Sequence, residues 1–360
     1  KNIGLDLGFL NNRLNVSFDA YIRDTKDMLM AGKTLPGVYG ASSPRMNVAD
    51  LRTKGWEASV TWGDSFTLAS KPFNYRIMAG IGDNTSKVTK YDNPNRTLTD
   101  PYEGQQLGEI WGYVVDGYFK TDEEARNYKV DQSFVNQMIN ASALDNGLHA
   151  GDLKFVDLDG NNKIEQTTSA NDRKDMKVIG NSLPRYNYNF GISADWYGID
   201  FSVLFQGIGK QNWYPGAETS MFWGPYSRPY ASFIPSDFMS QVWSEENTNA
   251  YFPRPRGYVA LGSNRELAVV NTKYLQNLAY CRLKNLSIGY TLPDKWLSKI
   301  GFEKIRVYFS GENLLTFTKL HSDYIDPEQA SASNSWKTSK SDANIYPWAK
   351  TYSFGVDITF

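Results

Sequence analysis

One loop of this sequence carries oxygen-bearing side chains at the spacing that binds a hard cation. Asp157, Asp159 and Asn161 stand at positions one, three and five of the pattern, and Lys163 at position seven would offer its backbone carbonyl. Calcium prefers such oxygen ligands, supplied from alternate residues of one turn. A hydrophobic residue, Ile164, follows at position eight. The pattern predicts a structural calcium site, which would stiffen the loop and take no part in catalysis.

This loop departs from a complete calcium-binding sequence at two positions. Asn162 stands where glycine is usual at the turn, although asparagine also tolerates a left-handed backbone. The twelfth position is Thr168 in place of a bidentate glutamate, so Asp172 would have to replace it, and Glu165 could join through a water molecule. The alternative interpretation is a hairpin of Asx turns that holds no metal. Apart from calcium, the sequence predicts no cofactor.

A second stretch, residues 211–233, is rich in aromatic residues. Its candidate contact residues are Trp213, Tyr214, Phe222, Trp223 and Tyr226. Exposed aromatic rings stack on sugar faces or anchor protein interfaces. Three interpretations stay open for this loop: contact with a substrate, packing against a partner protein, or packing of the loop on itself.

Composition excludes several other kinds of site. A net charge of -1 gives no electrostatic case for binding nucleic acid. The single cysteine, Cys281, excludes an intrachain disulfide, and His149 and His321 have no cysteine or histidine neighbours at zinc-ligand spacing. The sequence contains no nucleophile elbow, no glycine-rich phosphate loop and no metal triad. We therefore predict a protein that is not an enzyme.

The elements that would position these loops are β-strands with two different faces. In the last strand, the residues on one face are Tyr352, Phe354, Val356, Ile358 and Phe360, and the residues between them are small or polar. Side chains alternate along a strand, so one face here is wholly apolar. This alternation fits a transmembrane β-barrel with lipid outside and a polar lumen inside. The last strand of a soluble β-sandwich would alternate in the same way.

The connections between strands decide between these folds. Nine strand candidates are residues 2–10, 13–23, 54–63, 72–82, 185–196, 199–208, 278–292, 304–317 and 352–360. Short connections alternate with long loops near 24–53, 83–184, 209–277 and 318–348. All long loops therefore open on one rim, as in barrels with tight periplasmic turns and long extracellular loops. A sandwich gives no reason for this order, so we predict an all-β fold, a transmembrane antiparallel β-barrel.

An open sheet of these strands would leave two exposed edges, so we expect further strands upstream of this sequence. The strand pattern begins at once, with Ile3, Leu5, Leu7 and Phe9 on one face, which also favours a segment of a longer chain. Strand tilt and length fit a large barrel of about 22 strands, the plugged transporter class.

Several stretches resemble the SusC/RagA family of TonB-linked outer-membrane transporters. Residues 274–292, followed by Pro293, are similar to the family signature yLRLKNLtLGYtLP, and residues 305–318 are similar to its strand vRvYlsgqNLfTfT. Further matches are residues 54–57 to NKGwE (with Thr53 where asparagine is usual), 151–164 to GDikykDlNgDGkI, 179–184 to iGnp.P, 243–256 to W.peNpnA.yPR, and 326–328 to DPE. The matches run in order along residues 1–360, which identifies the whole chain as the C-terminal portion of such a barrel.

The resemblance implies TonB-dependent import of oligosaccharides or peptides across the outer membrane of a Gram-negative bacterium. A SusD-like surface lipoprotein would cover the barrel from outside, and outer-membrane lipid would surround it. TonB would act through an N-terminal plug and TonB box, which this sequence does not contain. Two alternatives stay open: a siderophore or vitamin receptor of the TonB-dependent class, and a soluble surface glycan-binding β-protein.

Overall fold

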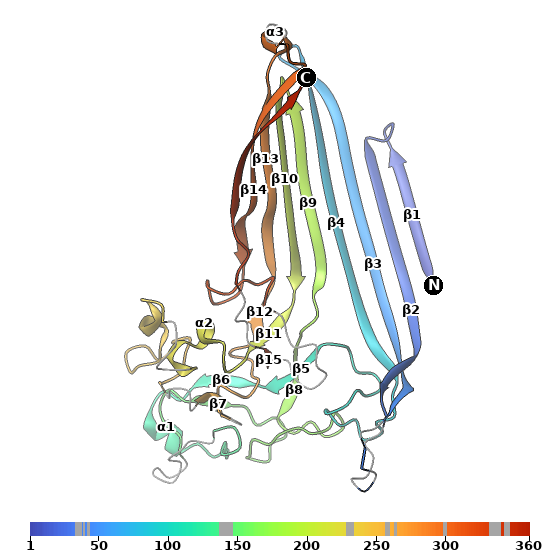
Figure 1. The fold of residues 1–360 in the computed structure, drawn as a ribbon. Helices are drawn as coiled ribbons and strands as arrows, with labels where there is room; N and C mark the ends of the chain where they lie inside the picture. The colour runs from blue at the N-terminus through green and yellow to red at the C-terminus, as the bar shows by residue number, and fades with distance from the viewer. Residues whose placement is uncertain are drawn as a thin grey trace.

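The computed structural model describes residues 1–32, 38, 40–41, 44–136, 147–227, 234–255, 260–262, 265–297, 301–330, 340–341 and 346–360. Its main element is one nine-stranded sheet in which all neighbouring strands are antiparallel (Figure 1). In sheet order the strands are β1 (Asn2–Phe9), β2 (Leu14–Ala31), β3 (Arg45–Leu68), β4 (Lys71–Lys90), β9 (Arg185–Trp196), β10 (Ile199–Lys210), β13 (Tyr280–Thr291), β14 (Lys304–Thr318) and β16 (Thr351–Thr359). The sheet is open, with β1 and β16 at its edges.

Strand register aligns similar side chains across the sheet. One apolar row joins Ile77 of β4 to Ile192 of β9, then to Val203 of β10 and Leu286 of β13. The neighbouring row on the opposite face is made of small hydroxyl residues. Because successive side chains point to opposite faces, these registers give the sheet one apolar and one polar face.

The apolar face has no core to cover it. On β16, Phe354 is 83% exposed and Val356 is 57% exposed, and on β1 Ile3 is 78% exposed. The other sheets among the described residues have only two or three short strands, and none packs on this face as the second layer of a sandwich. An exposed apolar face over the whole sheet is what lipid requires, which confirms the predicted barrel wall and excludes the sandwich.

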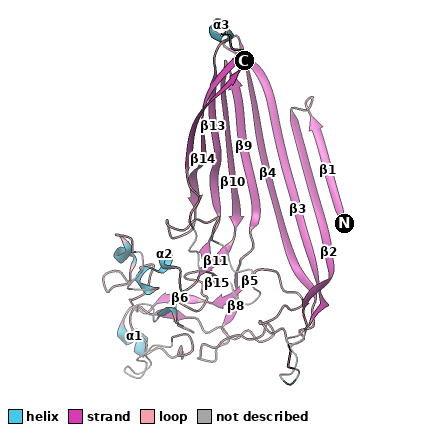
Figure 2. Ribbon diagram, viewed as in Figure 1, coloured by secondary structure: helices cyan, strands magenta, loops and turns pink. Residues whose placement is uncertain are grey.

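Short and long connections lie at opposite ends of the strands, as the sequence predicts. Two tight turns use positive φ at both central residues: Ala69 and Ser70 at 47° and 62°, and Tyr197 and Gly198 at 51° and 84°. This conformation matches the twist of the strands that it joins. The short turns gather at the upper end of the sheet and the long loops at the lower end (Figures 1 and 2).

Three strands extend further than their apolar alternation predicts. β2 continues to Ala31, β3 begins at Arg45 and β4 ends at Lys90. Parts of the predicted loops 24–53 and 83–184 are therefore strand, and those loop limits are wrong. Beyond Arg23 the residues 24–27 are polar on both faces and the residues 28–30 are apolar on both faces, and the register shifts near Thr25, so no alternation marks the strand there.

The long loops form a layer of their own at the lower end of the sheet (Figure 1). It contains β5 (Glu109–Tyr113), β6 (Val115–Tyr118), α1 (Asp122–Arg126), β7 (Leu153–Phe155), β8 (Met176–Asn181), β11 (Asn212–Pro215), α2 (Ser220–Trp223), η3 (Gly224–Tyr226), η4 (Phe238–Gln241), β12 (Gln276–Asn277) and β15 (Lys340–Ser341). The main buried cluster of the described residues lies in this layer and includes Phe155, Trp223, Phe252 and Tyr274. We call this cluster the loop core.

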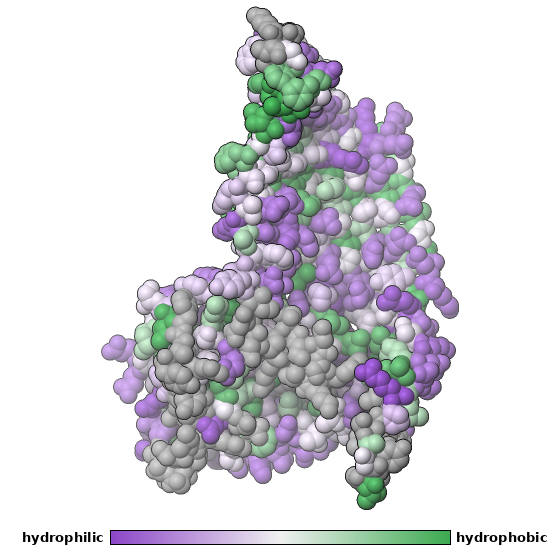
Figure 3. Space-filling view, in the orientation of Figure 1, coloured by the Kyte–Doolittle hydropathy of each residue, from purple (hydrophilic) through white to green (hydrophobic). Residues whose placement is uncertain are grey.

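Most of the sheet away from the loop layer is exposed or only partly buried. In the view of Figure 3, hydrophilic side chains cover much of the sheet, and a hydrophobic group lies near the short-turn end, where α3 (Asp294–Leu297) is found. No helix among the described residues is long and apolar enough to cross a membrane.

Candidate functional site

The polar face of the sheet carries an ordered row of hydroxyl groups. Ser193, Ser202, Ser287, Ser310 and Ser353 are register partners across β9, β10, β13, β14 and β16. Each hydroxyl can both donate and accept a hydrogen bond. Because serine is small, the row leaves the polar face open to a ligand while offering it hydrogen bonds.

Several charged groups of this face are hydrogen-bonded to one another or to a polar neighbour. The Arg306 guanidinium donates to both carboxylate oxygens of Asp200, at 2.8 and 2.6 Å, and to Asp357 at 3.2 Å. The carboxylate of Asp195 accepts a hydrogen bond from Asn74 at 2.7 Å. These charge-assisted bonds connect β14 to its neighbour β16, β4 to its neighbour β9, and β14 to β10 across the intervening β13.

The predicted cation site forms an acidic cluster with a different composition. Carboxylate oxygens of Asp157, Asp159 and Asp175 lie within 4.8 Å of one another. Asp175 is fully buried and accepts backbone hydrogen bonds from Leu158 at 2.8 Å and Glu165 at 2.7 Å. Burial, together with the negative charges of Asp159 and Asp157, raises the pKa of Asp175. A cation at this point would offset the cost of ionising Asp175.

Asp172, the residue that sequence spacing offers as a further ligand, lies elsewhere. Its carboxylate pairs with Lys174 at 3.6 Å, and Asp175 takes its place in the cluster. Asn161 makes an Asx turn, with its side-chain oxygen accepting from the backbone N–H of Lys163 at 2.8 Å. The residues present fit calcium, since three carboxylates converge, but the turns are also complete without a metal.

The five aromatic candidates of the 211–233 loop are buried within the chain. Trp213, Tyr214 and Trp223 are 0% exposed, Tyr226 is 1% exposed and Phe222 is 2% exposed. Three of these side chains donate hydrogen bonds to backbone carbonyl groups. Tyr214 donates to Leu267 at 2.8 Å, Trp223 to Gly216 at 2.9 Å and Tyr226 to Pro253 at 2.6 Å.

This burial favours packing of the loop on itself among the three interpretations. These rings present no exposed face for a sugar or a partner in this conformation, so contact of this loop with either stays a prediction. Two other aromatic residues of this loop, Tyr230 and Phe233, lie outside the described residues, as does Tyr258 further along the chain.

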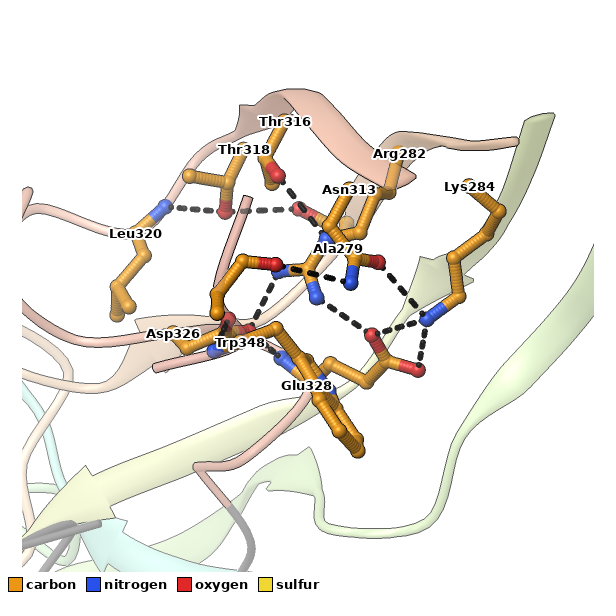
Figure 4. A network of polar contacts seen from close by, with 11 residues as sticks. Ala279, Arg282, Lys284, Asn313, Thr316, Thr318, Leu320, Asp326, Glu328 and Trp348 are labelled. Atoms are coloured by element: carbon orange, nitrogen blue, oxygen red, sulfur yellow. Dashed lines mark hydrogen bonds and ion pairs between the residues drawn. The ribbon is translucent and has the colours of Figure 1, made fainter. Parts of the chain in front are cut away.

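Sequence reasoning missed a buried ion network where the sheet meets the loop layer (Figure 4). Arg282 of β13 is 2% exposed. Its two terminal nitrogens bind Asp326 and Glu328, each at 2.6 Å, and Lys284 binds Glu328 at 3.0 Å. All four residues lie in stretches that match family motifs, Arg282 and Lys284 in one and Asp326 and Glu328 in another. Nothing in the sequence shows that the two motifs are in contact.

The network fixes residues 319–330, which we call the strap, to the barrel wall. The other end of the strap enters the loop core, where Leu320 and Ile325 are buried. The backbone N–H of Trp348 also donates to Asp326, at 3.1 Å. The strap thus connects strand β13 to the loop core through buried contacts at both ends.

His321 makes the contact between the strap and the loops around Tyr251. The two rings stack with 3.5 Å between centroids, and His321 Nε2 lies 2.8 Å from Gln241 Oε1. Burial, aided by the nearby positive charge of Lys273, lowers the pKa of His321 against the opposing effect of Asp323. The neutral imidazole is therefore the form that this contact favours.

Comparison with known proteins identifies the kind of chain that has this architecture. Over its whole length the chain is 28% identical to TonB-dependent receptor P3 of Formosa agariphila, and 23% identical to TonB-dependent receptor SusC of Bacteroides thetaiotaomicron. It spans about a third of these relatives, 34% and 31% of their lengths. The chain is a SusC/RagA-like portion of a TonB-dependent receptor. No family model matches the sequence.

Solved structures agree with the fold of this SusC/RagA-like chain. All of it aligns with 34% of a chain in the RagAB peptide importer in its open-open state, with a TM-score of 0.68 at 22% identity. The RagAB peptide transporter gives a TM-score of 0.69 at 20% identity. The open nine-stranded sheet therefore corresponds to part of the β-barrel of these receptors.

Proposed function

We propose that the protein containing this SusC/RagA-like chain imports an oligosaccharide or a peptide across the outer membrane of a Gram-negative bacterium. It acts as a transporter and not as an enzyme. The observation that carries this proposal is the two-faced sheet, exposed and apolar on one side and lined by the serine row on the other. Such a wall satisfies its backbone hydrogen bonds within lipid and leaves a polar path inside.

The chain's own residues contribute three parts of this activity. The serine row and the Arg306 network keep the inner wall polar and ordered. The loop core, held by the strap, forms the outer mouth. A SusD-like lipoprotein covers this mouth, and TonB supplies energy through a plug that belongs to the rest of the protein. RagAB, by name a peptide importer, supports the cargo class, and the relation to SusC supports the lipoprotein partner.

Deleting the gene for the complete receptor tests this proposal. The deletion strain should lose uptake of one class among a panel of glycans, peptides and iron chelates, and the purified receptor should carry a surface lipoprotein with it. Loss of iron-chelate uptake alone would favour the siderophore alternative. If the receptor partitions into the aqueous phase without detergent, the soluble glycan-binding alternative gains and the importer proposal fails.

A further inference from the structure

Three cationic side chains gather on the apolar face of the sheet, toward the long-loop end of the strands. Arg52 and Lys54 of β3 and Lys87 of β4 are all exposed. Strand register places Lys54 opposite Ile22 of β2, and Lys87 opposite Arg52. Register partners point to the same face of a sheet, so all three cations share the lipid-facing side with Ile22. We call these three residues the cationic patch.

The cationic patch lies at the height where the apolar band of the wall ends. Asp64 and Lys54 bound the apolar stretch of β3, and about 33 Å separates them along the strand at about 3.3 Å per residue. A strand tilted by about 35–45° rises about 25 Å over this length, which is the height of the apolar band of such a barrel. Arg52 and Lys87 lie one step further out, at the depth of the lipid headgroups. The residues between Asp64 and Lys54 on this face are Trp56, Ala58, Val60 and Trp62.

Arg52 is held in place with one terminal nitrogen available. Its Nε and Nη2 donate to the two carboxylate oxygens of Asp24, at 2.6 and 3.1 Å. A bidentate pair of this kind fixes the plane of the guanidinium. Among the described residues no acceptor is found for Nη1 of Arg52, so this nitrogen can donate to an anion from outside the chain.

The two lysines of the cationic patch carry charge that their neighbours do not neutralise. Lys54 and Lys87 belong to no ion pair within the part of the chain that the structure describes. Arg52 lies directly opposite Lys87, and like charges in this position destabilise a sheet. A bound anion would relieve this repulsion.

Two further carboxylates flank the cationic patch and have partners of their own. Asp83 of β4 pairs with Arg185. Asp50 of β3 accepts a hydrogen bond from the backbone N–H of Asp27 at 2.9 Å and lies opposite Lys90. The described carboxylates of this region are therefore engaged, and the anion that the patch complements comes from its surroundings.

Those surroundings are lipid, because the rest of the receptor lies elsewhere. Further strands continue the sheet beyond its edges at β1 and β16, whereas the cationic patch lies on the inner strands β3 and β4. The plug of the proposed transporter lies in the lumen, on the opposite face. The patch is also local, since the same face carries no cation at the long-loop ends of β13 and β14, where the described residues are Cys281, Leu283, Leu315 and Phe317.

A phosphate-bearing lipid matches both kinds of surface found here. Lysine and arginine bind phosphate oxygens, and Thr85, opposite Lys54 on the same face, adds a hydroxyl donor. Next to the patch, Ile22 and Trp56 offer apolar surface to acyl chains. A free anion would use the charge alone, and a zwitterionic lipid would bring a cation that the patch repels.

We propose that the cationic patch binds the phosphate group of an anionic lipid in the outer leaflet, whose acyl chains lie along the apolar face. The phosphate neutralises Lys54 and Lys87 and connects β3 to β4 at the membrane surface. This inference takes the orientation of the sheet from the proposed function, and it does not depend on which nutrient is imported.

Lipid titration of the complete receptor, purified in detergent and freed of lipid, tests this assignment. The probes are lipid A with both phosphate groups, the same lipid after both phosphates are removed, and inorganic phosphate, and bound lipid is measured by native mass spectrometry. Removing the phosphates should weaken binding by at least about thirtyfold, since each lysine near a membrane surface contributes about fivefold. Inorganic phosphate in tenfold excess should not compete, because it has no acyl chains.

Variants locate the site on the wall. Lys54→Gln and Lys87→Gln should each weaken binding of phosphorylated lipid A by about fivefold, and together by about thirtyfold, with no change for the dephosphorylated lipid. Lys71→Gln is the matched control, because Lys71 lies on the same face at the short-turn end, opposite Leu68, and this substitution should change neither affinity. Heat-dependent mobility on gels confirms that each variant barrel is folded, and the single variants keep the test available if the double variant does not fold.

Four results would overturn the lipid site: equal affinity for the two lipids, a double variant that binds phosphorylated lipid A like the unaltered receptor, an equal loss in Lys71→Gln, or displacement of the lipid by inorganic phosphate. If one of these is found and the deletion strain still loses uptake of a nutrient, the import function stands without the lipid site. If the deletion strain loses no uptake, the import function fails, whereas the lipid measurement remains valid.

Discussion

Arg282 of β13 and Asp326 of the strap form an almost fully buried ion pair between residues 44 positions apart. Arg282 Nη2 lies 2.6 Å from Asp326 Oδ1, and the two side chains are 2% and 5% exposed. Glu328 and Lys284 extend the pair into a network with balanced charge (Figure 4). This is the buried connection between the barrel wall and the strap.

Arg282→Met should destabilise the receptor strongly. The substitution leaves Asp326 buried and without its partner, which costs on the order of 3–5 kcal/mol in the free energy of unfolding. Denaturant titration of the complete receptor in detergent measures the change. Arg13→Met is the matched control, because the Arg13–Asp64 pair is largely exposed and is worth about 0–1 kcal/mol. Equal losses in the two variants would contradict a role for burial.

The substitutions Ile288→Arg and Ser287→Arg test which face of β13 meets lipid. Ile288 lies on the apolar face and Ser287 lies on the polar face, in adjacent positions of one strand. An arginine that faces lipid costs up to about 2–4 kcal/mol, depending on its depth in the membrane, whereas one that faces the lumen is tolerated. Only Ile288→Arg should therefore lower the amount of receptor assembled in isolated outer membranes. Equal assembly of both variants would count against the orientation of the sheet.

The sequence predicts the sheet well because the side chains of membrane strands alternate between apolar ones that face lipid and polar ones that face the lumen. Every strand of the nine-stranded sheet overlaps a predicted segment, from β1 to β16. Beyond Arg23 in β2, residues 24–27 are polar on both faces and residues 28–30 are apolar on both faces, so the alternation ends. The strand limits in the loop layer could not be predicted for the same reason.

The candidate sites were predicted less well, because they depend on contacts between distant segments. Spacing alone could not show that Asp175 replaces Asp172 in the acidic cluster, since the turn between them decides which carboxylate points inward. Composition could not distinguish a buried Trp223 from an exposed one. The serine row of the polar face likewise depends on strand register, which is known only once the strands are paired.

Acid should loosen the strap through His321. Burial lowers the pKa of His321 below its usual 6.5, so the contribution of this group to stability is complete above pH 6.5. It is lost as pH falls below 6.5 toward the lowered pKa, because the unfolded segment takes up the proton first. Hydrogen exchange of residues 319–330 should therefore be faster at pH 5 than at pH 7.5, after correction for intrinsic rates. His321→Gln should remove most of this difference, and an unchanged difference in that variant would contradict the assignment.

Calcium, if the acidic cluster binds it, should protect residues 151–175. Burial raises the pKa of Asp175, so without metal the loop loses stability as pH rises from 3.8 through the raised pKa. At neutral pH a chelator should therefore speed hydrogen exchange of this segment, and added calcium should reverse the effect. Asp175→Asn should abolish the calcium response and Asp172→Asn should keep it. A segment that does not respond to chelator would leave only the Asx-turn interpretation.

An import function requires the apolar face of the sheet to meet lipid and the polar face to meet the lumen. Single cysteines at Val203 and Ser202, introduced after every native cysteine of the receptor, Cys281 included, is replaced by serine, place a fluorophore on each face of β10 at neighbouring positions. In the complete receptor reconstituted into vesicles, brominated lipid should quench the fluorophore at position 203 and leave that at position 202 bright. Equal quenching at both positions, or quenching at 202 alone, would contradict the lipid-facing and lumen-facing assignment on which the import proposal rests.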